Sequence, residues 1–266
     1  METASKDVLF TIAMNLELPS LLKWCASNSR INRNVCLNDD VWRSKLLQDY
    51  PDFQIFNLNR SLRETYVFLY QLSYIKKLLN TGESLYEIFL KKEIDFSRKG
   101  LKKVLAFDLP NLERLDLDTN QLSEVPSFNL PNLQVLVLSD NQLTKVPAFH
   151  LPNLQRLDLD RNQLTEVPAF DLPNLQFLSL YNNQLTKVPT FNFPNLIALN
   201  LQYNQLTEVP AFDFPNLRSL YLYNNRLTEV PVFRLPNVIA LNLHNNRLTE
   251  TAKKRIKEKY KDKVEL

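Results

Sequence analysis

The sequence contains very little glycine. Only Gly82 and Gly100 occur among its 266 residues, whereas glycine-rich phosphate loops, dinucleotide fingerprints and the G-x-S-x-G nucleophile turn need glycines at fixed positions. Histidine is as rare, and His150 and His244 stand without a nucleophile or a ligand cluster at a suitable spacing. We therefore expect no enzymatic activity, no cofactor and no metal site.

Cysteine is scarce as well, and long apolar runs are missing. Cys25 and Cys36 have no neighbouring cluster of histidine or cysteine, a usage that predicts free thiols and a reducing compartment. No stretch approaches the roughly 18 apolar residues of a membrane span. The N-terminal residues carry acids and polar groups where a signal peptide would have an unbroken apolar segment. These absences predict a cytoplasmic protein.

Charge of one sign is missing over most of the chain. The formal net charge is +3, and residues 250–266 hold seven basic against four acidic side chains. The remaining chain is therefore close to neutral and shows no basic footprint of a nucleic-acid binder. We expect neither nucleic acid nor membrane among the partners.

One segment of 21 residues occurs in seven consecutive copies. The copies begin at Leu109, Leu130, Leu151, Leu172, Phe193, Phe214 and Leu235. Leu157 and Leu159 alternate with Arg156, Asp158 and Asp160, which predicts a short strand with one buried face. The return path that follows contains two prolines, so it is predicted to be extended and non-helical.

The pattern resembles the L-x-x-L-x-L-x-x-N-x-L signature of leucine-rich repeats over residues 109–249. The resemblance implies a solenoid with a parallel sheet on its concave face, in which stacked coils bury leucines that one coil cannot bury alone. One asparagine per copy is expected to point inward and bond backbone groups: Asn120, Asn141, Asn162, Asn183, Asn204, Asn225 and Asn246. A ladder of Phe107, Phe128, Phe149, Phe170, Phe191, Phe212 and Phe233 is expected beneath the returns.

Both ends of the repeat deviate from the template. Residues 94–107 keep the apolar positions but have Lys99 in place of the asparagine, which predicts a degenerate first coil and about eight coils in all. After Thr249 the pattern stops, and Ile256 and Tyr260 lie four residues apart on one face of a predicted capping helix. The lysines of that helix are interpreted as a solvated outer face, with contact to phosphate or membrane as the alternative.

Residues 7–50 follow helical spacing and predict three or four short helices. The segments "VLFTIAMNLELPSLLKWCASNSRIN" and "DDVWRSKL" resemble an F-box, a module that in its family docks onto a Skp-type adaptor of cullin ubiquitin ligases. The resemblance implies adaptor contacts by Val8, Leu9, Ile12, Leu18, Pro19, Leu22, Trp24, Ile31 and Trp42. Box and repeats together resemble proteins encoded by large DNA viruses, which would place the chain in the host cytoplasm or nucleus.

The predicted fold is α+β, with four parts in chain order. They are an F-box-like helical domain (1–56), a helical connector and N-terminal cap (57–90), a leucine-rich-repeat solenoid of about eight 21-residue coils (91–249) and a C-terminal capping helix (250–266).

A partner-binding face is predicted where the strands point away from the core, because those positions vary while the buried ones are copied. The candidate residues are Arg114, Asp116, Asp118, Val135, Arg156, Asp158, Asp160, Phe177, Tyr181, Tyr203, Tyr221, Tyr223 and His244. The aromatic residues are the expected anchors for a protein, although tyrosine also simply suits strands. A cation site among the four aspartates is disfavoured by the interleaved Arg114 and Arg156.

The sequence thus predicts a non-enzymatic protein-binding protein that is a monomer outside its complex. The leading hypothesis is the substrate-recognition adaptor of a Skp-cullin-F-box ubiquitin ligase. The alternative is a leucine-rich-repeat scaffold whose helical N-terminus is only a cap.

Overall fold

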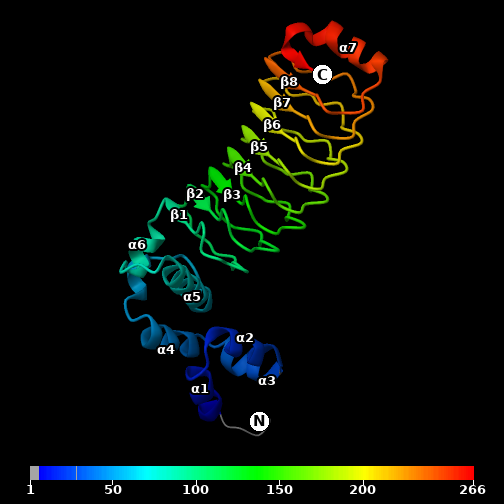
Figure 1. Ribbon diagram of the computed structural model, residues 1–266. Coiled ribbons are helices and arrows are strands. Elements are labelled where there is room, and N and C mark those ends of the chain that lie inside the picture. The colour runs from blue at the N-terminus through cyan, green and yellow to red at the C-terminus, as the bar shows by residue number, and fades with distance from the viewer. Residues whose placement is uncertain (1–5, 28) are drawn as a thin grey trace. The chain divides into compact units, whose positions relative to one another are not determined.

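The computed structural model describes residues 6–27 and 29–266. It divides into two compact units, residues 1–89 and 90–266. The first unit is helical and the second is a solenoid (Figure 1). The predicted boundary at residue 56 falls inside the helical unit. Within the described residues, no helix is long and apolar enough to cross a membrane.

The solenoid is built on one parallel sheet whose strands follow chain order. The strands are β1 (Glu93–Asp95), β2 (Arg114–Asp116), β3 (Val135–Val137), β4 (Arg156–Asp158), β5 (Phe177–Ser179), β6 (Ala198–Asn200), β7 (Ser219–Tyr221), β8 (Ala240–Asn242) and β9 (Val264–Glu265). Equivalent residues of successive coils are paired, so Leu115 lies beside Leu136 and Leu136 beside Leu157. The strands line the concave side of the curve and the returns its wider outer arc (Figure 1). The predicted fold class is confirmed.

Copied leucines form the core of the solenoid. Leu154, Leu157, Leu159 and Leu164 are completely buried, and so are their equivalents in most other coils. Phenylalanine side chains fill the space beneath the returns, where Phe170 stacks on Phe149 and Phe191 at 6.1 and 6.4 Å between ring centroids. Each interface buries the same side chains again, so the stability of the solenoid grows coil by coil.

The predicted asparagine ladder ties each coil to its neighbour. Asn162 Oδ1 accepts from the Leu143 N–H at 3.0 Å, and its Nδ2 donates to the carbonyls of Leu138 and Leu159 at 2.9 and 3.1 Å. Asn183 repeats the pattern one coil later and donates to the Leu159 carbonyl as well. One side chain therefore satisfies backbone groups that the buried bend would leave unpaired.

A second asparagine ladder, which was not predicted from the sequence, follows the proline at the start of each copy, shortly before the strand. Asn153 Nδ2 donates to the Pro131 carbonyl at 2.8 Å, and Asn174 to the Pro152 carbonyl at 2.8 Å. These bonds join successive coils at an exposed edge. The signal available in the sequence was the Pro-Asn pair after the leading Leu or Phe of every copy.

The backbone N–H groups at the bend of the first coil are hydrogen-bonded although this coil has no asparagine of its own. Lys99 takes that place, and the next coil's Asn120 accepts from the backbone N–H groups of Lys99 and Leu101 at 3.1 and 2.9 Å. Ile94 and Phe96 are fully buried, as in a regular coil. The degenerate coil is thus a true member of the stack, completed by the coil after it.

The C-terminal segment is more than the predicted capping helix. Helix α7 (Glu250–Tyr260) buries Ala252, Ile256 and Tyr260, and the Tyr260 hydroxyl donates to the Phe233 carbonyl at 3.1 Å. The chain then forms the 3-10 turn η3 (Lys261–Lys263) and strand β9, which extends the sheet beyond β8. The Leu243 N–H donates to the Glu265 carbonyl at 2.8 Å. The segment covers the end of the core and one sheet edge together.

The helical unit has a core of its own. Its elements are α1 (Lys6–Met14), α2 (Leu18–Ser27), α3 (Ser29–Ile31), the π-helical turn η1 (Asn32–Cys36), α4 (Asp39–Asp49), the 3-10 turn η2 (Phe53–Phe56), α5 (Leu62–Leu79) and α6 (Leu85–Phe89). Leu9, Leu21, Trp42 and Leu69 are at most 1% exposed. The Trp42 indole N–H donates to the Cys36 carbonyl at 3.1 Å, which anchors α4 to the preceding turn.

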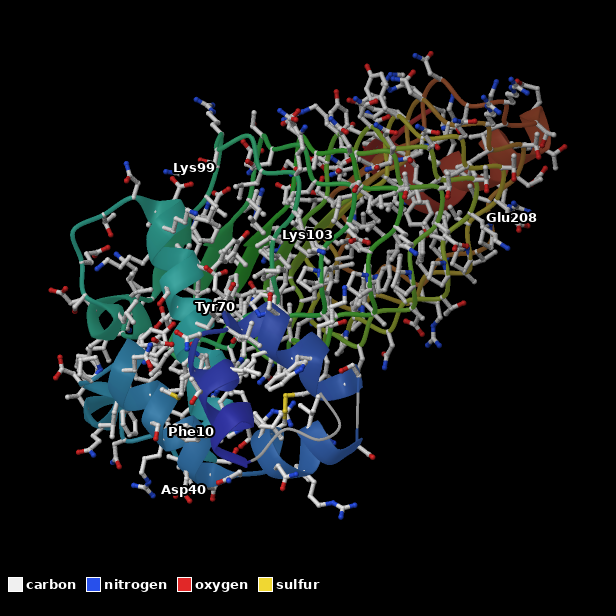
Figure 2. All side chains as sticks on the ribbon, turned by 90° about the horizontal axis from the view of Figure 1, so that it is seen from below. Phe10, Asp40, Tyr70, Lys99, Lys103 and Glu208 are labelled. Atoms are coloured by element: carbon white, nitrogen blue, oxygen red, sulfur yellow. A yellow bond between two sulfur atoms is a disulfide. The ribbon has the colours of Figure 1, made fainter. Side chains whose placement is uncertain are left out.

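The two cysteines are bonded to each other, so the prediction of free thiols is wrong. Cys25 in α2 and Cys36 in η1 form a disulfide with a Cα–Cα separation of 6.1 Å, and the sulfur bond is visible in the helical unit (Figure 2). The turn through α3 and η1 reverses the chain and brings together residues that are 11 positions apart. The spacing of two cysteines in a sequence carries no information on such a reversal.

Candidate partner-binding face

Alternation along each strand places three columns of side chains on the concave face of the solenoid. The first column is Arg114, Val135, Arg156, Phe177, Ala198, Ser219 and Ala240; the second is Asp116, Val137, Asp158, Ser179, Asn200, Tyr221 and Asn242; the third is Asp118, Ser139, Asp160, Tyr181, Gln202, Tyr223 and His244. Most of them are half-buried, whereas the strand leucines between them are fully buried. The predicted columns therefore share one face.

Arginine and aspartate pair within strands at the charged end of this face. Arg114 lies 2.7 Å from the Asp116 carboxylate, and Arg156 lies 3.1 Å from that of Asp158. The Ser139 hydroxyl also donates to Asp158 at 2.9 Å, and both of these side chains are buried. Partly exposed pairs of this kind contribute about 0–1 kcal/mol each to stability. Their geometry orients the carboxylates more than it stabilises the fold.

Asp160 lies next to these pairs in the third column. Its Oδ1 accepts from the Tyr181 N–H at 2.9 Å. Burial raises the pKa of Asp160, and the nearby Asp158 carboxylate adds to this; against the opposing hydrogen bonds from Ser179 and Tyr181 and the charge of Arg161, the net result is a pKa of about 6. The raised pKa shows that a negative charge is unfavourable at this point of the face.

A fourth column follows the third, at the position before each ladder asparagine. Thr119, Asp140, Arg161, Asn182 and Tyr203 stand there with φ between 49° and 55°. Arg161 forms a bidentate pair with Asp140, with Nε–Oδ1 and Nη2–Oδ2 distances of 2.7 and 2.6 Å. The predicted contact residues include only Tyr203 from this column. The fixed distance to the ladder asparagine could have identified the others.

Four aromatic rings, here called the aromatic row, cross the last four coils: Tyr181, Tyr203, Tyr223 and His244. The ring centroid of Tyr203 lies 5.3 Å from those of both Tyr181 and Tyr223, in edge contacts. Tyr223 stacks on His244 at 4.7 Å with an angle of 9° between the rings. Tyr203 is 44% exposed. The left-handed backbone at Tyr203 places its ring between two rings of the third column.

The other predicted contact residues stand apart from the aromatic row. Phe177 is 38% exposed at the start of β5, Val135 is half-buried in β3 and Tyr221 is half-buried in β7. Among the described residues, neither Phe177 nor Tyr221 makes a ring contact with the row. They lie in the first and second columns, all on the same side of the row.

The predicted adaptor contacts divide into buried and accessible side chains. Leu9, Leu18, Ile31 and Trp42 are between 1% and 6% exposed and belong to the core. Ile12, Leu22 and Trp24 are half-buried, and Pro19 is exposed. The side chain of Val8 lies outside the part of the chain that the structure describes. Only the half-buried and exposed group has surface that a partner can contact.

A cleft of about 620 Å³ opens in the helical unit, and sequence reasoning did not find it. Tyr50, Tyr66, Tyr70 and Tyr74 line it together with the predicted Leu18. The buried Lys45 ammonium lies 3.2 Å from the Asp49 carboxylate, which also accepts from the Tyr66 hydroxyl at 2.5 Å. Tyr66, Tyr70 and Tyr74 share one face of α5 because they are four residues apart. That spacing was the signal available in the sequence.

No group of three or more histidine, cysteine, aspartate or glutamate side chains could hold a metal ion in residues 6–27 and 29–266. Asp116, Asp118, Asp158 and Asp160 therefore do not converge on a cation position. The prediction that the protein is not an enzyme stays a prediction.

Family models match more than half of the chain. A model for two copies of leucine-rich repeats matches residues 131–172, 173–213 and 215–253, and a model for a single leucine-rich repeat matches residues 111–133. The chain belongs to the leucine-rich-repeat proteins. No curated protein matches this leucine-rich-repeat protein.

Several solved leucine-rich-repeat structures are similar to the chain. YopM from Yersinia enterocolitica is 25% identical with a TM-score of 0.51, covering 67% of this chain and 47% of YopM. A chain of the octameric complex of Latrophilin 3, Unc5D and FLRT2 is 29% identical with a TM-score of 0.52, covering 58% and 53%. A Shigella effector domain, 22% identical with a TM-score of 0.55, covers 76% and 88% and shows likeness of fold alone. The match spans about half the length of the first two structures.

Proposed function

We propose that this protein is the substrate-recognition adaptor of a Skp-cullin-F-box ubiquitin ligase. Its solenoid binds a target protein on the concave face, and its helical unit docks a Skp-type adaptor. Outside the complex it is a monomer in the cytoplasm, or in the host cytoplasm or nucleus if its origin is viral. The protein itself catalyses no step, because it acts by raising the effective concentration of one partner near the other.

The contrast between a copied frame and a varied face carries the proposal. The ladder asparagines and strand leucines repeat almost without change, while the concave columns run from arginine and aspartate to tyrosine, amide and histidine. Leucine-rich-repeat proteins are generally protein-interaction scaffolds, and one similar chain was solved within an assembly of several proteins. Aromatic side chains that keep some exposed surface, such as those of the aromatic row, are typical anchors of protein interfaces.

Apolar side chains of the helical unit that keep exposed surface support the adaptor half of the proposal. Its core closes around Leu9, Leu21 and Trp42, yet Ile12, Leu22 and Trp24 keep exposed surface. Leu22 and Trp24 belong to α2, and Ile12 to α1. These three side chains are the expected contacts with a Skp-type adaptor.

The test is capture of a purified Skp-type adaptor by the full-length protein. We expect capture by the wild type and its loss in Leu22→Ser/Trp24→Ala, because both changes remove accessible apolar surface. The matched control Leu37→Ser/Leu47→Ser alters leucines of the same unit that are 67% and 53% exposed and should retain capture.

Circular dichroism of each variant must show an intact helical unit. If the wild type binds no Skp-type or cullin subunit while an ordinary F-box protein does, the adaptor role is wrong. The helical unit would then be only a cap for a leucine-rich-repeat scaffold, and Leu22→Ser/Trp24→Ala would lower thermal stability alone.

A further inference from the structure

Within the coils of β1 to β8, charge in the four columns is confined to the first four coils of the concave face. Over the four columns, the coils of β1 to β4 carry seven acidic and four basic side chains. The acids are Glu93, Asp95, Asp116, Asp118, Asp140, Asp158 and Asp160, and the bases are Arg98, Arg114, Arg156 and Arg161. The coils of β5 to β8 carry no aspartate, glutamate, lysine or arginine in these columns. A chain of net charge +3 thus presents a negative half-face, here called the acidic half.

Three of the four arginines of the acidic half are already engaged in ion pairs. Arg114 and Arg156 pair with the aspartates two residues on, and Arg161 holds Asp140 with two hydrogen bonds. Asp118 and Asp160 have no ion-pair partner among the described residues; they accept from the Thr119 hydroxyl at 2.6 Å and the Tyr181 N–H at 2.9 Å. In the third column these two carboxylates are therefore uncompensated, as Glu93 and Asp95 are in the coil of β1 among the described residues.

The aromatic row begins where the carboxylates end. Asp160 and Tyr181 occupy the third column of successive coils, and the Arg161 guanidinium lies 6.0 Å from the Tyr181 ring centroid. A cation placed between the Asp160 carboxylate and the Tyr181 ring would gain both ion pairing and a cation–π contact. Beyond it, the uncharged surface over Tyr203 and Tyr223 suits an apolar or aromatic side chain.

We propose that the concave face binds an extended segment of a protein that places a lysine or arginine against Asp118 and Asp160 and an apolar or aromatic residue over Tyr203. The segment runs across the strands from the acidic half to the aromatic row. Five strand steps of ~4.8 Å separate the coils of Asp118 and Tyr223, and at ~3.3 Å per extended residue they correspond to about seven residues. This inference rests on the proposed function and names the chemistry of the target.

The negative charge excludes other occupants on physical grounds. Phosphate groups of a nucleic acid would be repelled by Asp118, Asp158 and Asp160. An acidic peptide would meet the same repulsion, and a purely apolar one would leave the two uncompensated carboxylates desolvated without a partner. Charge complementarity therefore selects a cationic segment.

The test is selection of a random seven-residue peptide library on the full-length protein at pH 7.5. We expect enrichment of peptides with a basic residue and, three or four positions away, an aromatic or large aliphatic one. Affinity of the best synthetic peptide should fall about tenfold in Asp118→Asn/Asp160→Asn, where asparagine keeps the hydrogen-bond acceptor but not the charge. Tyr203→Asn, compatible with the left-handed backbone, should also weaken binding.

The matched control is Glu166→Gln/Glu208→Gln, which removes the same charge from exposed positions of the returns (Glu208 is labelled in Figure 2) and should leave affinity unchanged. The inference is overturned by selected peptides without basic residues, by equal binding to Asp118→Asn/Asp160→Asn, or by failure to select any peptide. If the selected peptides lack basic residues, the proposed preference for a cationic segment is wrong, but binding of a protein segment on the concave face still stands. The Skp-type adaptor experiment on the helical unit is independent of all three results.

Discussion

At the residue scale, the position before each ladder asparagine has a left-handed backbone conformation, and the residues found there differ in how well they tolerate it. The φ angles there are 52° at Thr119, 49° at Arg161, 55° at Asn182 and 54° at Tyr203. Left-handed backbone costs most L-residues about 1–2 kcal/mol, and asparagine tolerates it best after glycine. In a protein with two glycines, the bends at Arg98, Thr119, Arg161 and Tyr203 therefore retain strain that a single substitution can relieve.

Thr119 is the least suitable residue at this position because it is β-branched. We expect Thr119→Asn to raise the free energy of unfolding by about 0.5–1 kcal/mol. The reciprocal Asn182→Thr should lower it by a similar amount, since both residues occupy the same place in their coils. Urea unfolding of the two variants measures the pair. Equal signs for the two changes would show that the backbone angle does not govern stability here.

Asp160 gives the solenoid a predictable response to pH. Its folded pKa of about 6 exceeds that of an unfolded aspartate, so the folded state binds the proton more tightly. This group's contribution to stability is therefore fully present at pH values below the unfolded pKa and is lost as the pH rises through about 6. Asp160→Asn should stabilise the protein at pH 7 by about 1 kcal/mol, allowing for solvent screening.

The measurement is the free energy of unfolding of the wild type and Asp160→Asn at pH 7 and pH 5. The gain from the substitution should shrink on acidification, because the wild-type carboxylate becomes neutral as well. A gain that is the same at both pH values would argue against the raised pKa.

At the scale of elements, the two asparagine ladders contribute unequally. Asn162→Ala leaves the carbonyls of Leu138 and Leu159 with bonds from Asn141 and Asn183, but the buried Leu143 N–H loses its acceptor. We expect a loss of about 2 kcal/mol for the unpaired donor and the space left behind. Asn153→Ala exposes only the Pro131 carbonyl to water and should cost about 0.5 kcal/mol. Equal losses in urea unfolding would contradict this assignment.

The end of the solenoid shows what element patterns cannot predict. Helix α7 was predictable because Ile256 and Tyr260 are four residues apart and buried on one face. Strand β9 has only two residues, Val264 and Glu265, too few for any alternation. Its place depends on the turn η3 and on the open edge of β8, where the Leu243 N–H needs an acceptor. A sequence pattern records neither condition.

At the scale of the whole molecule, most of the solenoid could be predicted from the sequence because its segments are repeated. Each interface uses the same leucines, asparagines and phenylalanines, so one copy predicts the rest, including the columns of the concave face. Three features could not be predicted from the sequence. They are the Cys25–Cys36 disulfide, the contact of Tyr203 with Tyr181 and Tyr223, and the environment of Asp160. They depend on a chain reversal, on a left-handed backbone angle and on side chains one coil away, none of which a local pattern specifies.

We infer that the copied frame of leucines, asparagines and phenylalanines holds the fold while the varied concave face stays available to a partner. The most direct test of this inference compares the free energies of unfolding of two variants, the triple variant Tyr181→Ser/Tyr203→Asn/Tyr223→Ser and Asn162→Ala. We expect the triple variant to stay within about 1 kcal/mol of the wild type, because it loses only partly exposed ring contacts and relieves the backbone at Tyr203. Asn162→Ala alone should lose about 2 kcal/mol. A triple variant destabilised as much as Asn162→Ala would show that the aromatic row belongs to the frame and would contradict the claim.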